Sequence, residues 1–238
     1  MKIDVYFTPI GLVPGDVSGR AVVVIDALRA TSTVIAAIAN GAKAVIPAAT
    51  SDEAIRVASN LEKDGVLLAG ERRSLKIEGF DLGNSPREMT PEAVGGKTIV
   101  LATTNGTPAL VAAQGGEPVL VGAAVNFSAL LERVRGLLDE RGEIVIVCSG
   151  RERQFALEDA YTAGRLVKAV KGRKKLDLND GGLAALALVG AYPDWDAAFA
   201  STAAARQLVE ASLEDDVSYC AKPDRFGVVP QYAERRIT

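Results

Sequence analysis

Four consecutive β-branched residues, Val22 to Ile25, are the feature that most restricts how this chain can fold. A strand with one face in water alternates apolar and polar side chains, whereas an unbroken apolar run is typical of a strand covered on both faces. Similar apolar runs recur at residues 97–102, 118–121 and 143–148, and segments with helical character separate them. This alternation predicts an α/β fold with mainly parallel sheets.

The expected elements follow one another along the whole chain. Strands are predicted at 2–7, 22–25, 43–47, 65–69, 97–102, 118–121 and 143–148, and helices at about 32–40, 50–61, 107–114, 127–140 and 155–170. The basic run at 172–175 is predicted to be a solvated turn, and residues 228–230 a short strand. We expect a single unit over 1–238 in which two similar α/β lobes, about 1–95 and 96–175, share a cleft; the part at about 176–238 is helical.

A self-match at nearly constant spacing indicates an internal duplication. Any two units of this fold class also share glycine and valine positions, so chance similarity stays open as the alternative. If the duplication is real, the strand ends that carry Arg29 and Asn105 should face one shared cleft. At an offset of 74 the matches are Thr33 with Thr107, Gly41 with Gly115 and Val45 with Val119, and at an offset of 80 Gly70 matches Gly150.

Composition restricts the class of protein. Of the 238 residues 48% are hydrophobic and 24% charged, so the chain can bury a large core. The net charge of −3 argues against a nucleic-acid binder, and no apolar run is long enough to span a membrane. Two cysteines make no disulfide framework, and the first residues do not resemble a signal peptide. We expect a cytoplasmic protein with a small-molecule partner, no nucleic acid and no membrane; a homo-oligomer stays open.

The chain contains no histidine. This absence excludes phosphohistidine chemistry, serine–histidine hydrolysis and histidine-based zinc sites. Catalysis must therefore use carboxylates, hydroxyls, amides, arginine or lysine, a thiol, or a metal held by oxygen ligands.

Polar side chains follow the strand at 22–25. Asp26 ends this strand, Arg29 comes three residues later, and the hydroxyls of residues 31–33 open the next helix. In an open α/β sheet, ligands bind beyond the carboxyl ends of the strands, where helix N-termini direct free N–H groups outward. An acid there can hold a cation, and an arginine with hydroxyls can hold an anion, which suits a phosphorylated substrate bound with a metal. The alternative is a hydroxyl helix cap beside a surface ion pair.

Three other segments carry candidate chemistry. The hydroxyls and glycine of 103–107 suit an anion at a helix start, although Asn105-Gly106 is also a common turn. The loop at 70–86 is longer than most connections in compact domains, which favours a functional loop over a solvated excursion. Glu158 and Asp159 either complement a helix dipole or hold Mg²⁺. Cys148 is expected to be a buried structural thiol, since no histidine can activate it.

Taken together, these segments resemble the 2-phosphosulfolactate phosphatase family. The resemblance is collinear and spans essentially the whole chain, with a mild departure at Cys148-Ser149-Gly150, where the family often has a Cys-Ala-Gly-like turn. The segments that carry it are Val24–Thr33, Gly70-Glu71, Gly79–Pro86, Thr103–Thr107, Glu158-Asp159, Asp180-Gly181 and Val228–Pro230.

The resemblance implies a phosphoric monoester hydrolase that uses Mg²⁺ to convert (R)-2-phospho-3-sulfolactate to (R)-3-sulfolactate and phosphate. Within this reading, either water attacks the phosphorus directly or a carboxylate such as Asp26 attacks it first. The alternative of another class is a non-catalytic protein that binds a small sulfonated or phosphorylated metabolite.

Site roles follow from the resemblance together with the chemistry of the side chains. Expected catalytic residues are Asp26, Arg29 and Glu71. Candidate Mg²⁺ ligands are Asp26, Asp81, Glu158 and Asp159. Expected substrate-binding residues are Arg29, Thr31, Ser32, Thr33, Lys76, Asn84, Ser85, Thr104, Asn105, Gly106 and Thr107.

Overall fold

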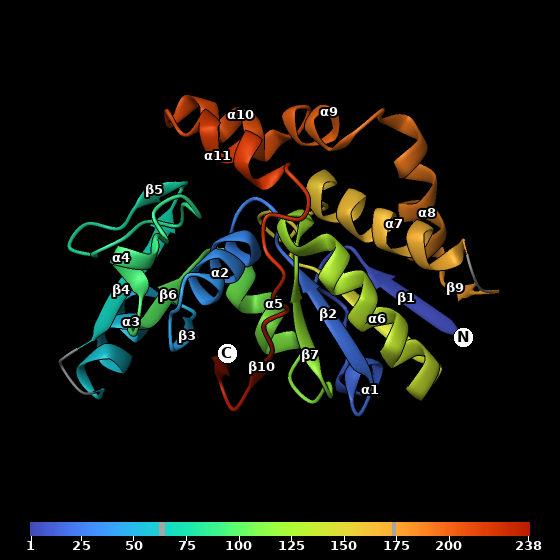
Figure 1. Ribbon diagram of the computed structural model, residues 1–238, viewed down its shortest axis with the longest axis horizontal. Helices are drawn as coiled ribbons and strands as arrows, with labels where there is room; N and C mark the ends of the chain where they lie inside the picture. The colour runs from blue at the N-terminus through green and yellow to red at the C-terminus, as the bar shows by residue number, and fades with distance from the viewer. Residues whose placement is uncertain (62–64, 173–174) are drawn as a thin grey trace.

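The computed structural model describes residues 1–61, 65–172 and 175–238, and its strands form two sheets (Figure 1). Sheet A has the order β7-β2-β8-β1-β9 and is parallel throughout. Sheet B has the order β10-β11-β3-β6-β4-β5, with β3, β6 and β4 parallel and the outer strands antiparallel. Arg173 and Lys174, in the expected basic turn, lie outside the described residues. The strands are β1 (Lys2–Tyr6), β2 (Ala21–Ile25), β3 (Ala44–Ala48), β4 (Val66–Arg72), β5 (Leu75–Lys76), β6 (Thr98–Ala102), β7 (Val119–Gly122), β8 (Glu143–Cys148), β9 (Asp177–Leu178), β10 (Tyr232–Ala233) and β11 (Arg236–Ile237).

Helices lie between the two sheets and on their outer faces. Val22 and Val24 of β2 pack with α2, α5 and the inner face of sheet B, whereas Val23 and Ile25 pack with α6 and α7. All four side chains are buried, which confirms the prediction of a strand covered on both faces. Helix α3 covers the outer face of sheet B. The helices of these layers are α2 (Ala30–Ala39), α3 (Ser51–Ser59), α5 (Gly106–Ala112), α6 (Phe127–Arg141) and α7 (Leu157–Lys171); α1 (Pro14–Val17) and α4 (Pro91–Val94) are single turns.

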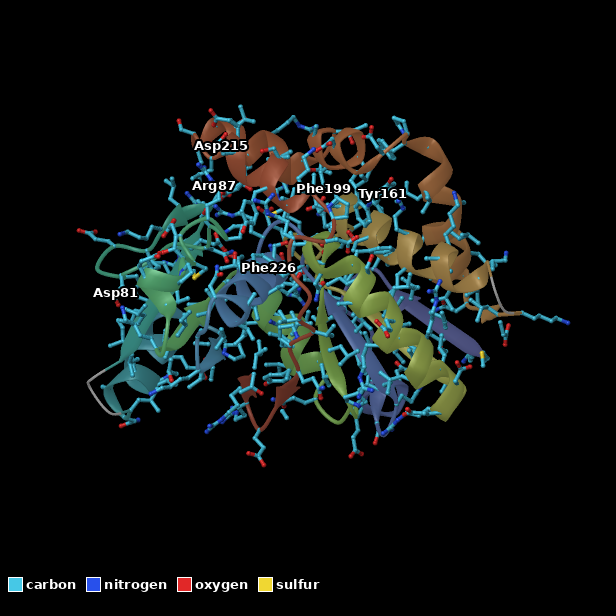
Figure 2. All side chains as sticks on the ribbon, viewed as in Figure 1. Asp81, Arg87, Tyr161, Phe199, Asp215 and Phe226 are labelled. Atoms are coloured by element: carbon cyan, nitrogen blue, oxygen red, sulfur yellow. The ribbon has the colours of Figure 1, made fainter. Side chains whose placement is uncertain are left out.

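The C-terminal part packs on α7 and then returns to the sheets. Tyr161 of α7 and Phe199 of α9 belong to the aromatic core beneath this helical cover (Figure 2). The predicted strand at 228–230 is wrong: this segment is coil, and pairing begins at Gln231, which forms an isolated bridge with Leu120 of β7 just before β10. Pro230 has no N–H with which to continue a ladder. No helix in the described ranges is long and apolar enough to cross a membrane. The helices here are α8 (Asp180–Leu188), α9 (Trp195–Ala200), α10 (Ala203–Glu210) and α11 (Glu214–Cys220).

The chain crosses from one sheet to the other and back. The connection β2–α2–β3 leads from sheet A to sheet B, and β6–α5–β7 leads from sheet B to sheet A. The two sheets have equivalent central strands when β2 is matched with β6, β3 with β7 and β4 with β8. Under this matching, the order β3-β6-β4 of sheet B corresponds to the order β7-β2-β8 of sheet A. This equivalence supports the duplication that the self-match indicates.

The sheets do not follow the expected lobe boundaries. β1 and β2 lie in sheet A while β3 and β4 lie in sheet B, although all four precede residue 95. Strands from both halves of the chain therefore build each sheet, and a division at residues 95 and 175 stays a prediction.

Candidate active site

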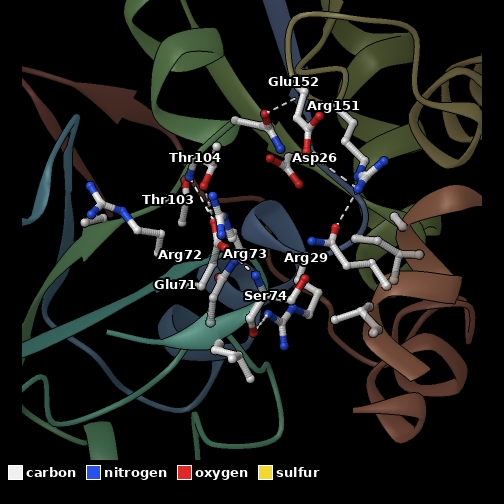
Figure 3. A pocket seen from close by; sticks show the side chains of 18 of the residues that line it. Asp26, Arg29, Glu71, Arg72, Arg73, Ser74, Thr103, Thr104, Arg151 and Glu152 are labelled. Carbon is white, nitrogen blue, oxygen red and sulfur yellow. Dashed lines mark hydrogen bonds and ion pairs between the residues drawn. The ribbon is translucent and has the colours of Figure 1, made fainter. Parts of the chain in front are cut away.

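A pocket of about 890 Å³ opens at the carboxyl ends of strands from both sheets (Figure 3). Asp26 and Gly150 lie beyond β2 and β8 of sheet A. Glu71 of β4 and Thr103 after β6 come from sheet B, and Gln207 of α10 adds a wall from the C-terminal part. This is the edge of an α/β sheet at which the sequence predicts a ligand.

Asp26 lies in this pocket, where the end of β2 turns into α2. Its Oδ1 accepts a hydrogen bond from the Ala30 N–H at 3.2 Å, and Thr31 braces the turn through hydrogen bonds to the backbone of Asp26. Burial raises the pKa of Asp26 to about 6, and the charge of Glu71 adds to this effect. Hydrogen bonds and the charge of Arg29 act in the opposite direction. The peptide bond between Leu28 and Arg29 is cis.

Glu158 and Asp159 meet Asp26 from the first turn of α7. Asp159 Oδ1 accepts the Ala27 N–H at 2.8 Å, and Oδ2 accepts from Ser149 Oγ at 3.0 Å and the Gly150 N–H at 3.1 Å. Burial, together with the charge of Asp26, raises the pKa of Glu158 to about 7 and lifts the pKa of Asp159 well above its usual value. Both acids line the pocket. Asp159 is the anchor of this group, because both of its oxygens accept protein hydrogen bonds.

Glu71 joins two loops at the opposite side of the pocket. Its Oε1 accepts hydrogen bonds from the backbone N–H and the hydroxyl of Thr104 at 2.9 and 2.8 Å, and its Oε2 accepts the Ser74 N–H at 2.9 Å. Glu71 thereby fixes the position of both loops, and the catalytic role expected for it stays a prediction.

Arg29 lies in the pocket wall, but its charge is already paired. Nη1 donates to Oδ2 of Asp216 at 2.7 Å, and Nη2 donates to the carbonyl of Ser74 at 2.8 Å. Only 3% of the Arg29 side chain and none of the Asp216 side chain is exposed. Ser85 completes the arrangement by donating to the other oxygen of Asp216 at 2.7 Å.

Four of the hydroxyls that were expected to bind the substrate, those of residues 31–33 and of Thr107, do not line the pocket. Thr31 and Ser32 donate to the carbonyls of Asp26 and Ala27, and Thr33 donates to the carbonyl of Asn84, each at 2.8 to 2.9 Å. Thr107 likewise donates to the Ala48 carbonyl at 3.0 Å. These side chains hold the helix starts in place.

The remaining predicted residues are divided between pocket and surface. Thr104, Asn105 and Asn84 line the pocket, and the side-chain oxygen of Asn105 accepts the Glu152 N–H at 3.0 Å. Gly106 allows α5 to approach α2 closely, because a Cβ there would lie 2.7 Å from the Ala30 Cβ.

Lys76 and Asp81 are not brought to the pocket. Both are exposed, and Asp81, at the left edge of the molecule in Figure 2, accepts the N–H of Leu68 in β4 at 2.8 Å. Proximity along the loop at 70–86 therefore did not indicate proximity in space.

Several pocket residues were missed in the sequence. Arg151 and Gln207 line the pocket from distant segments, and Asp216 reaches Arg29 from α11. The self-match aligns residues 150–153 with residues 70–73, and this alignment is the sequence feature that indicates a site role for Arg151. The acidic run at 214–216 has the pattern of a solvated helix start, so the sequence does not indicate that Asp216 is buried against Arg29.

Comparisons with known proteins identify the family of this chain. A family model described as 2-phosphosulpholactate phosphatase matches residues 6–235. A "Probable 2-phosphosulfolactate phosphatase" of Caldanaerobacter subterraneus is 40% identical over 233 residues, covering 97% of this chain and 95% of that protein. Proteins with the same name from Clostridium acetobutylicum (35% identical over the full length of both chains) and Thermotoga maritima (38% identical, covering 96% and 94%) also match. The resemblance seen in the motifs is confirmed, and this chain belongs to the 2-phosphosulfolactate phosphatase family.

Proposed function

We propose that this chain hydrolyses 2-phospho-3-sulfolactate to 3-sulfolactate and phosphate in the described pocket, with Mg²⁺ as cofactor. The observation that carries the proposal is the convergence of two buried acids with raised pKa, Asp26 and Glu158, in a pocket that arginines also line. A phosphorylated sulfonate needs both a cation at its phosphoryl group and donors at its other anions. Membership of the family supports the same substrate.

The donor set suits Mg²⁺ bound mainly by water and substrate. Among the described residues, no three His, Cys, Asp or Glu side chains form a ready-made metal cage. Mg²⁺ commonly uses only one or two carboxylates and fills its other positions with water and phosphate oxygens. Asp26 and Glu158 are the acids we assign to it, since Asp159 already accepts three hydrogen bonds. When bound, Mg²⁺ would neutralise charge on the phosphoryl oxygens.

The residues around the acids hold the site in shape. Asp159 fixes the turns after β2 and β8, and Glu71 fixes the turns after β4 and β6. We propose that the two sheets flank one cleft, so that the substrate contacts strand ends of both. Water attack and initial attack by Asp26 both break the phosphorus–oxygen bond to C2 of the substrate, and both stay open.

Phosphate release tests this proposal. Purified protein with Mg²⁺ and phosphosulfolactate should release inorganic phosphate, and EDTA should stop the release until excess Mg²⁺ is added. Asp26→Asn should lower kcat by at least about 100-fold while its circular dichroism spectrum stays native. No release with Mg²⁺ present, combined with thermal stabilisation by sulfolactate, would instead identify a non-catalytic binding protein.

A further inference from the structure

Two tight hairpins carry arginines at the mouth of the pocket (Figure 3). In one, Arg72 pairs with Leu75 across a turn formed by two residues with positive φ. In the other, Arg151 and Gln154 exchange two backbone hydrogen bonds of 2.9 Å across a second turn of the same kind. Such turns fix the direction of the chain tightly, so the backbone at Arg151 is held in place over the pocket.

Arg29 and Arg151 both line the pocket, but different groups balance their charges. Arg29 donates to a fully buried carboxylate, that of Asp216, and this pair is nearly neutral as seen from the pocket. A buried, paired guanidinium has little remaining attraction for a substrate anion.

Arg151 is held instead by a neutral group. Its Nη2 donates to Oε1 of Gln207 on α10 at 2.7 Å. The nearest carboxylate is that of Glu152, at 3.7 Å and with 70% of its side chain exposed, so water screens this attraction. Arg151 therefore keeps its charge while its orientation is fixed.

We propose that Arg151 binds an oxyanion of the substrate, its phosphate or its sulfonate, and that Gln207 is the positioning residue that orients the Arg151 guanidinium without neutralising it. This inference rests on the proposed function for the identity of the substrate. We assign to Arg151 the oxyanion role expected for Arg29, because Arg151 lines the pocket, Gln207 orients its guanidinium, and among the described residues no ion pair with a buried acid balances its charge.

The first test compares Arg151→Gln with Arg153→Gln, since Arg153 is exposed on the same hairpin and does not line the pocket. Loss of a charged hydrogen bond of about 1.5–3 kcal/mol should raise the KM for phosphosulfolactate roughly 10- to 100-fold in Arg151→Gln, with a much smaller change in kcat. Arg153→Gln should stay within about twofold of the natural protein. Equal KM values for the two variants would overturn the proposal.

Binding of the two reaction products tests the role of Arg151 independently of whether the protein hydrolyses phosphosulfolactate. Inorganic phosphate and sulfolactate are titrated individually, with Mg²⁺ present, into the natural protein and into Arg151→Gln. Weaker binding of phosphate alone places the phosphoryl group at Arg151, and weaker binding of sulfolactate alone places the sulfonate there. Unchanged binding of both overturns the role of Arg151 even if the natural protein hydrolyses phosphosulfolactate, and a protein that binds them through Arg151 without turnover contradicts only the proposed function.

The Gln207→Glu variant adds a negative charge beside Arg151 while it keeps the shape of the side chain that orients the guanidinium. The glutamate has the same shape and can accept the same hydrogen bond, but it would balance Arg151 as Asp216 balances Arg29. We expect the KM to rise at least about tenfold although the thermal midpoint does not fall, because a charged acceptor strengthens the contact with Arg151. A purely structural role for Gln207 gives the opposite result, an unchanged KM in a protein of equal or higher stability.

Discussion

At the scale of single residues, the contact with the largest expected effect on stability is the buried pair of Arg29 and Asp216. Asp216 accepts hydrogen bonds from both Arg29 and Ser85, so its carboxylate joins the turn after β2 to the loop before α4. Removing one partner of such a pair leaves an uncompensated charge in the interior.

We expect Asp216→Ala to lower the free energy of unfolding by about 3–5 kcal/mol, since Arg29 would stay buried without its acid. The matched control is Asp215→Ala, whose partner Arg87 lies 2.9 Å away with both side chains largely exposed (Figure 2). That change should cost less than about 1 kcal/mol. Urea unfolding of the two variants measures both values, and equal losses would contradict the prediction.

The raised pKa values predict how stability depends on pH in metal-free protein. Folding raises the pKa of Asp26 to about 6 and of Glu158 to about 7, so the folded state binds protons more tightly than the unfolded chain. The stability that these protons contribute is complete below the ordinary pKa values near 4 and is lost as pH rises through about 7.

Urea unfolding in EDTA should therefore give a lower free energy of unfolding at pH 7.5 than at pH 5. Glu158→Gln should flatten this slope, because glutamine does not titrate. Added Mg²⁺ should stabilise the protein more at pH 7.5, where the acids are charged. A slope that is the same in Glu158→Gln would show that other groups cause it.

At the scale of elements, the site depends on two helices that begin almost in contact. A Cβ at Gly106 would lie 2.7 Å from Ala30 Cβ and 3.1 Å from Asp26 Oδ2, so α5 approaches both the start of α2 and the acid. Gly136, inside α6, has open space where its Cβ would be.

Gly106→Ala should lower the free energy of unfolding by about 1–3 kcal/mol and reduce phosphate release, because α5 must move away from Asp26. Gly136→Ala, the control, should raise stability by about 0.4–1 kcal/mol through a less flexible unfolded chain. Thermal unfolding and an activity assay on both variants check these expectations, which fail if Gly106→Ala behaves like Gly136→Ala.

Local patterns predicted the elements well and the contacts between distant segments poorly. The apolar run at 22–25 and the acid after it predicted that Asp26 lies at the sheet edge where ligands bind. The acids at the start of the helix near residue 155 likewise predicted Glu158 as a site residue, and both line the pocket. The hydroxyls of residues 31–33 were predicted to bind an anion, but they donate to backbone carbonyls instead, because a hydroxyl can serve either partner. Asp216 and Gln207 gave no signal, since their partners lie far away in the sequence.

At the scale of the whole molecule, the crossed connections make the two sheets interdependent. β2 pairs with β7 and β8, whereas β3 and β4 both pair with β6, so strands of one half of the chain depend on partners from the other. Which sheet a strand joins is a property of the whole fold, and no local pattern predicts it.

A fragment of residues 1–95 should therefore remain unfolded on its own, because β2 and β3 would lack the strands that flank them. Co-expression with residues 96–238 should restore a native circular dichroism spectrum and phosphate release. Cooperative thermal unfolding of the isolated fragment would contradict the prediction and would instead support an independent first lobe.

The equivalence between β2–β3–β4 and β6–β7–β8 has a consequence for evolution. Two separate identical subunits related by a twofold axis must present the same groups on both sides of a shared site. If this chain arose by duplication, its two fused copies were free to diverge: one hairpin begins with Arg72 after Glu71, and the other begins with Arg151 after Gly150. A symmetric ancestor could thus give rise to a catalyst for a molecule whose two ends differ in chemistry.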